Sequence, residues 1–180
     1  MSDKSVSYWS DTRQGLRAVE LRAAGFEPSE AVNTNAVVTI ANAYTNAHRC
    51  NNRVRRIADL LVDAVASKGG QGLLVGAPAV SDALTQGTVN AGYSLASRDL
   101  MADCMETGHY AHHGNGMIVV SGCDKTGAAA LMPLARTNAF GLVVYPGTSS
   151  PGRVDFEPWA SKGNNLTIMD YMEGSAAREA

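Results

Sequence analysis

Two cysteines and three further polar residues follow short apolar blocks of the sequence, and all five are of types that bind metals. Cys50 and Cys123 each stand at a turn that leads into a helix, where free amide N–H groups and the helix dipole favour a thiolate. Two thiolates at one place suit a soft metal or an iron–sulfur cluster. Asp82 and Asp124 offer the hard oxygen donors that Mg²⁺ prefers, and Lys125 becomes an anionic ligand if it is carbamylated.

Each of these residues also has a purely structural interpretation. Isolated cysteines are mostly small buried hydrophobic residues, and an acid that follows a strand is a common helix N-cap. Lys125 beside Asp124 is also explained by a simple ion pair at the surface. The metal hypothesis therefore depends on whether the fold brings the five residues to one place.

The hydrophobic pattern alternates between the signatures of strands and helices. Short apolar, β-branched blocks predict strands at 37–41, 73–80, 117–120 and 142–145. Three-and-four spacing of apolar residues predicts helices at 54–65, 97–113 and 128–136. Ser97 is the expected N-cap of the second helix, and Pro133 is expected to kink or shorten the third.

Strands that alternate with helices imply an α/β fold, with a parallel sheet of about four strands and crossover helices on both faces. In such a sheet the turns that follow the strands all leave the carboxyl edge, where α/β folds bind ligands. The turns after the first three predicted strands carry Cys50, Asp82 and the run 123–125. The sequence therefore predicts that the five candidate residues meet at one edge of the sheet.

Other motifs favour structural roles. Cys104 falls on the apolar stripe of its helix, which predicts core packing. Near the end of that helix, three histidines would interact with the helix dipole as cations, and a metal site there is disfavoured for lack of acids at suitable spacing; they are His109, His112 and His113. The glycines at 69–72 precede a strand and so predict a turn, and the hydroxyl-rich segment 148–150 predicts a loop.

Composition narrows the classes of partner. The 180 residues include 15 basic and 17 acidic side chains, a balance that argues against binding to nucleic acid or to an anionic membrane. A signal peptide and a membrane-spanning stretch are both lacking, and three cysteines argue against a disulfide framework, so we expect a cytoplasmic protein with a small-molecule partner. One α/β domain is expected, with an arm and helix at 1–35, a cofactor-binding core at 36–152, and a connector with an incomplete helix at 153–180.

Five short elements match a known family in order and spacing. They read Asn-Ala-Tyr-Thr (42–45) leading to Cys-Asn (50–51), Val-Ser-Asp (80–82), Tyr-Ser-Leu-Ala-Ser-Arg (93–98), Gly-Cys-Asp-Lys-Thr (122–126) and Val-Tyr-Pro-Gly-Thr (144–148). In these elements the chain resembles the dihydroxy-acid dehydratase family, from about residue 16 to residue 180.

The resemblance implies an enzyme that removes water from a 2,3-dihydroxy acid to give a 2-keto acid in branched-chain amino-acid biosynthesis. In that family an iron–sulfur cluster acts as a Lewis acid on the departing hydroxyl, and Mg²⁺ holds the substrate. Carried over by motif, Cys50 and Cys123 are cluster ligands. The magnesium ligands are Asp82, Asp124 and carbamylated Lys125. Whether the cluster has two or four irons is left open.

The resemblance also implies what these residues lack. The family's third cluster cysteine, a further magnesium glutamate and the catalytic base serine are expected downstream. Arg49 stands where the family usually has proline, and Ala83 and Leu84 stand where Gly-Ile is usual. We therefore expect the N-terminal domain of a larger two-domain enzyme that is inactive alone and forms a homodimer at full length. The alternatives are a fragment of a sugar-acid dehydratase and a non-catalytic remnant without cofactor.

Overall fold

The computed structural model describes residues 11–27, 36–147, 157, 160–165, 167, 169–170 and 173. The chain divides into two compact units, Met1–Gly147 and Thr148–Ala180. Within the second unit, a 3-10 helix, η2 (Ala160–Asn165), carries Lys162, which forms an ion pair with Asp170. The predicted loop at 148–150 and most of the predicted helix at 166–180 lie outside the described residues.

The first unit is built on a four-stranded parallel sheet, as the sequence predicted. The strands lie in the order β2-β1-β3-β4, and their bounds are β1 (Val37–Asn42), β2 (Gln71–Gly76), β3 (Gly116–Val120) and β4 (Phe140–Val144). Asn42 ends β1 in register with Gly76 of β2 and Val120 of β3. These three strands therefore end at the same level, and the segments that follow them leave from a common edge.

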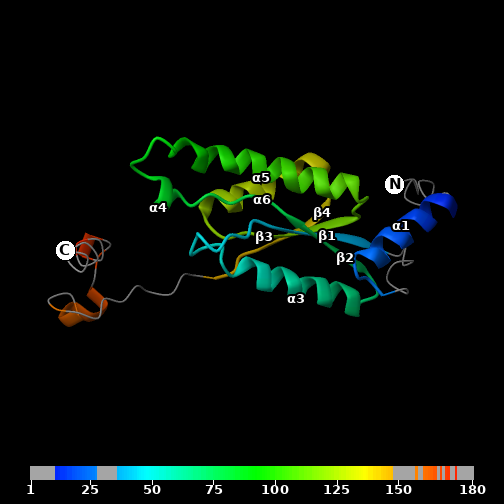
Figure 1. The fold of residues 1–180 in the computed structure, drawn as a ribbon, viewed down its shortest axis with the longest axis horizontal. Coiled ribbons are helices and arrows are strands. Elements are labelled where there is room, and N and C mark those ends of the chain that lie inside the picture. Colours follow the sequence, from blue (N-terminus) through cyan, green and yellow to red (C-terminus); the bar gives the residue numbers. More distant parts are fainter. Residues whose placement is uncertain are drawn as a thin grey trace. The chain divides into compact units, whose positions relative to one another are not determined.

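Helices cover both faces of this sheet (Figure 1). One face packs against α3 (Val54–Ser67), and the other packs against α5 (Gly92–Ala111) and α6 (Asp124–Thr137). A short helix, α4 (Asp82–Thr85), precedes α5, and α1 (Asp11–Ala23) precedes the sheet in the chain. Among the described residues, none of the helices has the length and apolar character needed to cross a bilayer.

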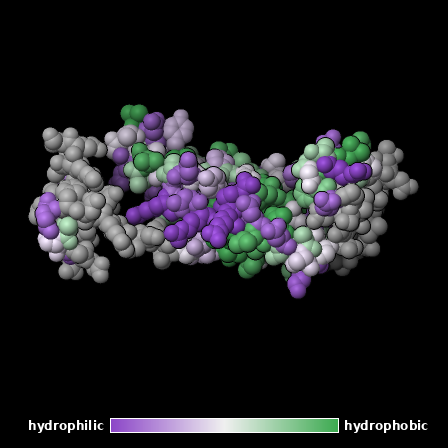
Figure 2. Space-filling model, turned by 60° about the horizontal axis from the view of Figure 1, so that its bottom comes forward, coloured by the Kyte–Doolittle hydropathy of each residue, from purple (hydrophilic) through white to green (hydrophobic). Residues whose placement is uncertain are grey.

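The core lies in two layers because residues of a parallel strand are buried on both faces. On β1, Ile40 packs with Val54 and Val120 on the α3 side, whereas Ala41 packs with Met101 of α5 on the other side. Figure 2, which brings the α3 side forward, shows hydrophilic side chains over much of that face. The exposed face of α3 includes the ion pair between Arg55 and Asp59. The amphipathic pattern that predicted α3 thus matches its burial.

The predicted bounds of several elements differ from the observed ones. Helix α5 begins at Gly92, and Ser97 lies inside it with its hydroxyl donating to the Ser94 carbonyl at 2.6 Å. Strand β2 spans Gln71–Gly76 instead of 73–80, because Gln71 and Gly72 of the predicted turn pair with Val37 and Val38 of β1. Helix α6 begins at Asp124 and continues beyond Pro133.

Candidate cofactor and metal site

The strand order creates a topological switch point between β1 and β3. From β1 the chain crosses to β2 on one side of the sheet, and it then returns to β3 on the other side. Open α/β sheets bind ligands in the crevice outside the carboxyl ends of the strands at such a point. Cys50 lies in the segment that follows β1, and Cys123 lies in the turn that follows β3. Both cysteines therefore flank the switch point.

Asn51 stabilises the loop that carries Cys50 through hydrogen bonds. The Asn51 side-chain amide donates to the Ala43 carbonyl at 2.7 Å, and its backbone N–H donates to the His48 carbonyl at 2.8 Å. The side chain is fully buried, so water does not compete for these bonds. The position of Cys50 is thus set by bonds within the loop and not by regular secondary structure.

Thr126 stabilises the turn that carries Cys123 through hydrogen bonds. The Thr126 hydroxyl accepts a hydrogen bond from the Gly122 N–H at 2.7 Å and donates one to the Cys123 carbonyl at 2.8 Å. Gly122 also packs against the first loop, where an added Cβ would lie 2.4 Å from Asn51 Oδ1 and 2.6 Å from the Cys50 carbonyl oxygen. The two cysteine-bearing segments therefore form one closely packed unit that admits only glycine at this position.

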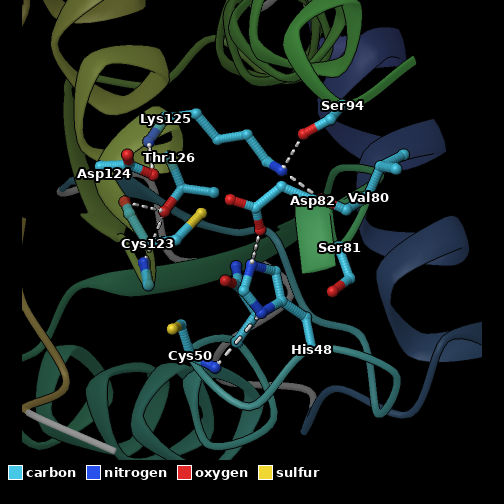
Figure 3. A network of polar contacts seen from close by, with 12 residues as sticks. His48, Cys50, Val80, Ser81, Asp82, Ser94, Cys123, Asp124, Lys125 and Thr126 are labelled. Carbon is cyan, nitrogen blue, oxygen red and sulfur yellow. Dashed lines mark hydrogen bonds and ion pairs between the residues drawn. The ribbon is translucent and has the colours of Figure 1, made fainter. Parts of the chain in front are cut away.

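A pocket of about 490 Å³ lies over this unit, and four of the five predicted residues line it: Cys50, Asp82, Cys123 and Asp124. The two cysteines are free thiols of intermediate exposure, and the two aspartates are exposed. Figure 3 shows these side chains around a common space. The fold thus brings the soft and hard donors together as expected, and their roles as ligands stay predictions.

His48 lines the same pocket, and sequence reasoning did not single it out. The His48 side chain is buried, with its Nε2 atom 3.6 Å from Asp82 Oδ1 and its Nδ1 atom accepting from the Cys50 N–H at 3.4 Å. Burial lowers the pKa of His48, and the negative charge of Asp82 offsets part of that effect. The one signal available in the sequence was the place of His48 in the loop that carries Cys50.

Lys125 is the fifth predicted residue, and it is not among the residues that line the pocket. It is 7% exposed, so the alternative of a surface ion pair with Asp124 is wrong. The ammonium group donates to the Val80 carbonyl and, at 2.8 Å, to the Ser94 hydroxyl (Figure 3). Asp124 instead accepts the backbone N–H of Lys125 at 2.8 Å. The ammonium therefore links α6 to the segment before α4 and to the first turn of α5.

The other titratable candidates lie away from this pocket. Cys104 is partly buried against the core cluster, as predicted. His109 is 4% exposed and its Nδ1 atom lies 3.0 Å from the Thr39 hydroxyl. Burial lowers the pKa of His109 and so disfavours the cationic imidazole that was expected at this helix end. His112 and His113 are exposed at the end of α5.

The donor set of the pocket fits the implied groups in part. Two free thiols suit iron, and two carboxylates suit Mg²⁺, whose charge would also offset the repulsion between them. Within the part of the chain that the structure describes, no three His, Cys, Asp or Glu side chains are arranged to hold an ion by themselves. These residues therefore supply a fraction of each ligand set.

Comparison with known proteins gives a consistent family. Residues 35–180 match the family described as "Dihydroxy-acid/6-phosphogluconate dehydratase N-terminal". The chain is similar to "Dihydroxy-acid dehydratase 1" of Cupriavidus pinatubonensis, with 39% identity over 76% of the chain and 23% of the relative. It is also similar to dihydroxy-acid dehydratases of Ralstonia nicotianae, with 36% identity over 78% of the chain and 24% of the relative, and of Herminiimonas arsenicoxydans, with 34% identity over 84% and 26%.

The matched region covers about a quarter of the length of these relatives. It includes the whole parallel sheet and both cysteine-bearing segments. The family match extends over much more than half of the chain, and the identities exceed 30%. The chain therefore belongs to the dihydroxy-acid/6-phosphogluconate dehydratase family and corresponds to its N-terminal part.

Proposed function

We propose that this chain supplies the amino-terminal part of the cofactor site of a dehydratase that converts a 2,3-dihydroxy carboxylic acid into a 2-keto acid. The single observation that carries the proposal is the pocket at the switch point, where Cys50 and Cys123 meet Asp82 and Asp124. Dehydration needs an acid for the departing hydroxide and a charge that stabilises the deprotonated α-carbon. Metals held side by side by soft and hard donors would meet both needs.

The residues divide by ligand type. Cys50 and Cys123 would hold an iron–sulfur cluster as thiolates, and Asp82 and Asp124 would hold Mg²⁺. When bound, the cluster and the magnesium ion supply Lewis acidity at the leaving hydroxyl and at the substrate carboxylate, respectively. The packed contact of Gly122 with Asn51 holds the two cysteine-bearing segments against each other. The dehydratase names of the relatives support the same reaction class.

Lys125 completes the hard-donor set in this proposal if it is carbamylated. A carbamate keeps one N–H, which can still donate to the Val80 carbonyl, and it adds two anionic oxygens. The Ser94 hydroxyl, which now accepts from the ammonium, can turn and donate to one of those oxygens. The buried contacts of Lys125 are therefore compatible with both forms, and native mass spectrometry distinguishes them by the mass of one CO₂.

The site is incomplete in this chain, so we propose that the chain alone does not turn over substrate. The resemblance implies that the remaining ligands and the base serine come from sequence beyond these residues, and the chain spans about a quarter of its relatives. A homodimer at full length, a cytoplasmic location and a role in branched-chain amino-acid synthesis belong to the same proposal. A sugar acid in place of the dihydroxy acid is the alternative substrate.

Anaerobic reconstitution with iron and sulfide tests the proposal. A small thiol is included to fill the cluster positions that two cysteines leave open. We expect the 180-residue chain to bind iron and acid-labile sulfide. Cys50→Ala and Cys123→Ala should each lose most of both, because each removes one pocket thiolate. Cys104→Ala should bind as the wild type does, because its sulfur packs against the core.

The same measurement has a clear negative outcome. A wild-type chain that is folded by circular dichroism and binds neither iron nor sulfide would support the non-catalytic remnant. Equal loss in Cys104→Ala and Cys50→Ala would show that iron is held by cysteines in general and not by this pocket.

A further inference from the structure

His48 is a buried polar side chain in the pocket with incomplete hydrogen bonding. Its side chain is 6% exposed, and its Nε2 atom makes no hydrogen bond to any described residue. Nε2 lies 3.6 Å from Asp82 Oδ1, just beyond hydrogen-bonding distance. Leaving a buried nitrogen unpaired costs free energy, so closing the short gap between His48 Nε2 and Asp82 Oδ1 would be favourable.

The hydrogen bond at the other ring nitrogen decides which contact this is. Nδ1 accepts the Cys50 N–H, so the proton of a neutral ring lies on Nε2 and points at the Asp82 carboxylate (Figure 3). Two adjacent ligands of an octahedral ion at about 2.1 Å would lie about 3.0 Å apart, which is shorter than the 3.6 Å separation of these two atoms. Ligation through Nε2 would put the proton on Nδ1, against the Cys50 N–H. The geometry therefore favours a donor over a metal ligand.

We propose that His48 is a positioning residue whose Nε2–H donates to Asp82 Oδ1 and holds that carboxylate in place at the pocket. Asp82 is the first residue of the short helix α4, and its side chain is 60% exposed. A carboxylate with one oxygen held by a donor presents the other to a cation. The imidazole also connects the Cys50 loop to Asp82, which joins the soft and hard donors through one ring.

The proposal rests on the proposed function in that Asp82 is taken to bind a divalent cation. Mn²⁺ is a suitable probe, because its binding is measured directly by electron paramagnetic resonance. His48→Leu removes the donor, and we expect Mn²⁺ affinity to fall by about 10- to 100-fold, the usual cost of losing an outer-sphere partner. His48→Gln places an amide N–H near the same point and should recover most of the affinity. In an Asp82→Asn background, His48→Leu should cause little further loss.

A purely structural role for His48 gives a different pattern. It would lower the thermal midpoint and weaken Mn²⁺ binding equally with and without the Asp82 carboxylate, which would overturn the proposal. Nitrogen hyperfine coupling from His48 to bound Mn²⁺ would also overturn it, because that coupling requires direct ligation.

Nitrogen-15 NMR of the histidine rings tests the donor geometry without any metal. We expect His48 to carry its proton on Nε2, and Asp82→Asn to shift the His48 Nε2 signal while leaving that of exposed His112 unchanged. A proton on Nδ1 would contradict the proposal. If the expected tautomer and shift are found but wild-type chain does not bind Mn²⁺, the link from His48 to Asp82 stands and the proposed metal site fails.

Discussion

Two buried histidines, His48 and His109, lie in different regions of the same unit. Both are about 95% buried, and burial lowers the pKa of both. His109 lies in the last turn of α5 and is buried in the core, where its Nδ1 atom pairs with the Thr39 hydroxyl at 3.0 Å. His48 lies at the carboxyl edge of the sheet, where its Nε2 atom has no hydrogen bond among the described residues. Burial alone therefore does not distinguish a core histidine from one at a site.

The difference lies in what surrounds each ring. Around His109, the Thr39 hydroxyl and the close backbone of Gly114 fill the available space. His48 lines a pocket that has space for a ligand, and the carboxylates of Asp82 and Asp124 give that pocket negative charge. Native cores satisfy their polar groups, so an unsatisfied group beside a cavity marks the place where a partner is missing. The comparison predicts that core and edge respond differently to substitution.

The largest effect is expected from Gly122→Ala, which disrupts the packing at the carboxyl edge of the sheet. The new Cβ would lie 2.4 Å from Asn51 Oδ1 and 2.6 Å from the Cys50 carbonyl oxygen, so the two cysteine-bearing segments must separate. We expect the free energy of unfolding to fall by about 3 kcal/mol, at the upper end for overpacking. Urea unfolding measures the stability, and the rate at which a thiol reagent labels Cys50 and Cys123 measures the disruption of the pocket.

Gly114→Ala is the matched change in the core. Its Cβ would lie 2.4 Å from His109 Nδ1 and 2.6 Å from the Thr39 hydroxyl, so the steric conflict is similar. It should also destabilise the fold, but the labelling rates of the pocket thiols should stay at wild-type values. Equal changes in labelling for the two variants would mean that edge and core are not separate regions.

Thr39→Val is expected to have the next largest effect. Valine has nearly the same shape as threonine but cannot bond His109, and it leaves a buried ring nitrogen unpaired. We expect the free energy of unfolding to fall by about 2 kcal/mol, the cost of an unsatisfied buried group. Chemical denaturation at pH 7.5 measures it. A change near zero would show that His109 finds another partner and would weaken the contrast with His48.

The sequence predicted the sheet and the meeting of the donors because both follow from strand–helix alternation. Apolar blocks set the strands, and parallel connections bring the segments after them to one edge. The start of α5 was missed because Ser97 has the residue type of an N-cap, whereas the helix begins at Gly92 without a side-chain cap. Local chemistry alone does not show that Ser97 is buried and bonded within the helix.

The contacts of His48 and Lys125 were beyond sequence reasoning for a related cause. Lys125 meets the Val80 carbonyl and the Ser94 hydroxyl, which lie far from it in the chain. His48 becomes notable because the ring is buried while Nε2 lacks a hydrogen bond. Both facts depend on how loops pack in three dimensions, and hydrophobic periodicity does not predict that packing.

The pH dependence of stability tests whether burial lowers the pKa of His109, the core histidine. Burial lowers the pKa of His109 in the folded state below its value of about 6.5 in the unfolded chain. As the pH falls below about 6.5, the unfolded state takes up a proton before the folded state does, so the free energy of unfolding decreases. Urea unfolding at pH 7.5 and 5.5 should show a smaller acid loss in His109→Gln than in the wild type, and equal losses in the two proteins would contradict this account.

The smallest expected effect is a gain from Gly127→Ala in α6. A Cβ on Gly127 would meet nothing within 4 Å, and the residue lies one turn after Cys123 inside the helix. Alanine loses less backbone freedom than glycine when a helix forms, so we expect about 0.5 kcal/mol of added stability. The contrast with Gly122 tests whether close packing, and not glycine flexibility, governs this edge. Thermal unfolding should rank the variants Gly127→Ala, wild type and Gly122→Ala in order of decreasing stability. A loss in Gly127→Ala as large as that in Gly122→Ala would mean that the turn into α6 needs flexible glycines, and the steric account of Gly122 would then have no support.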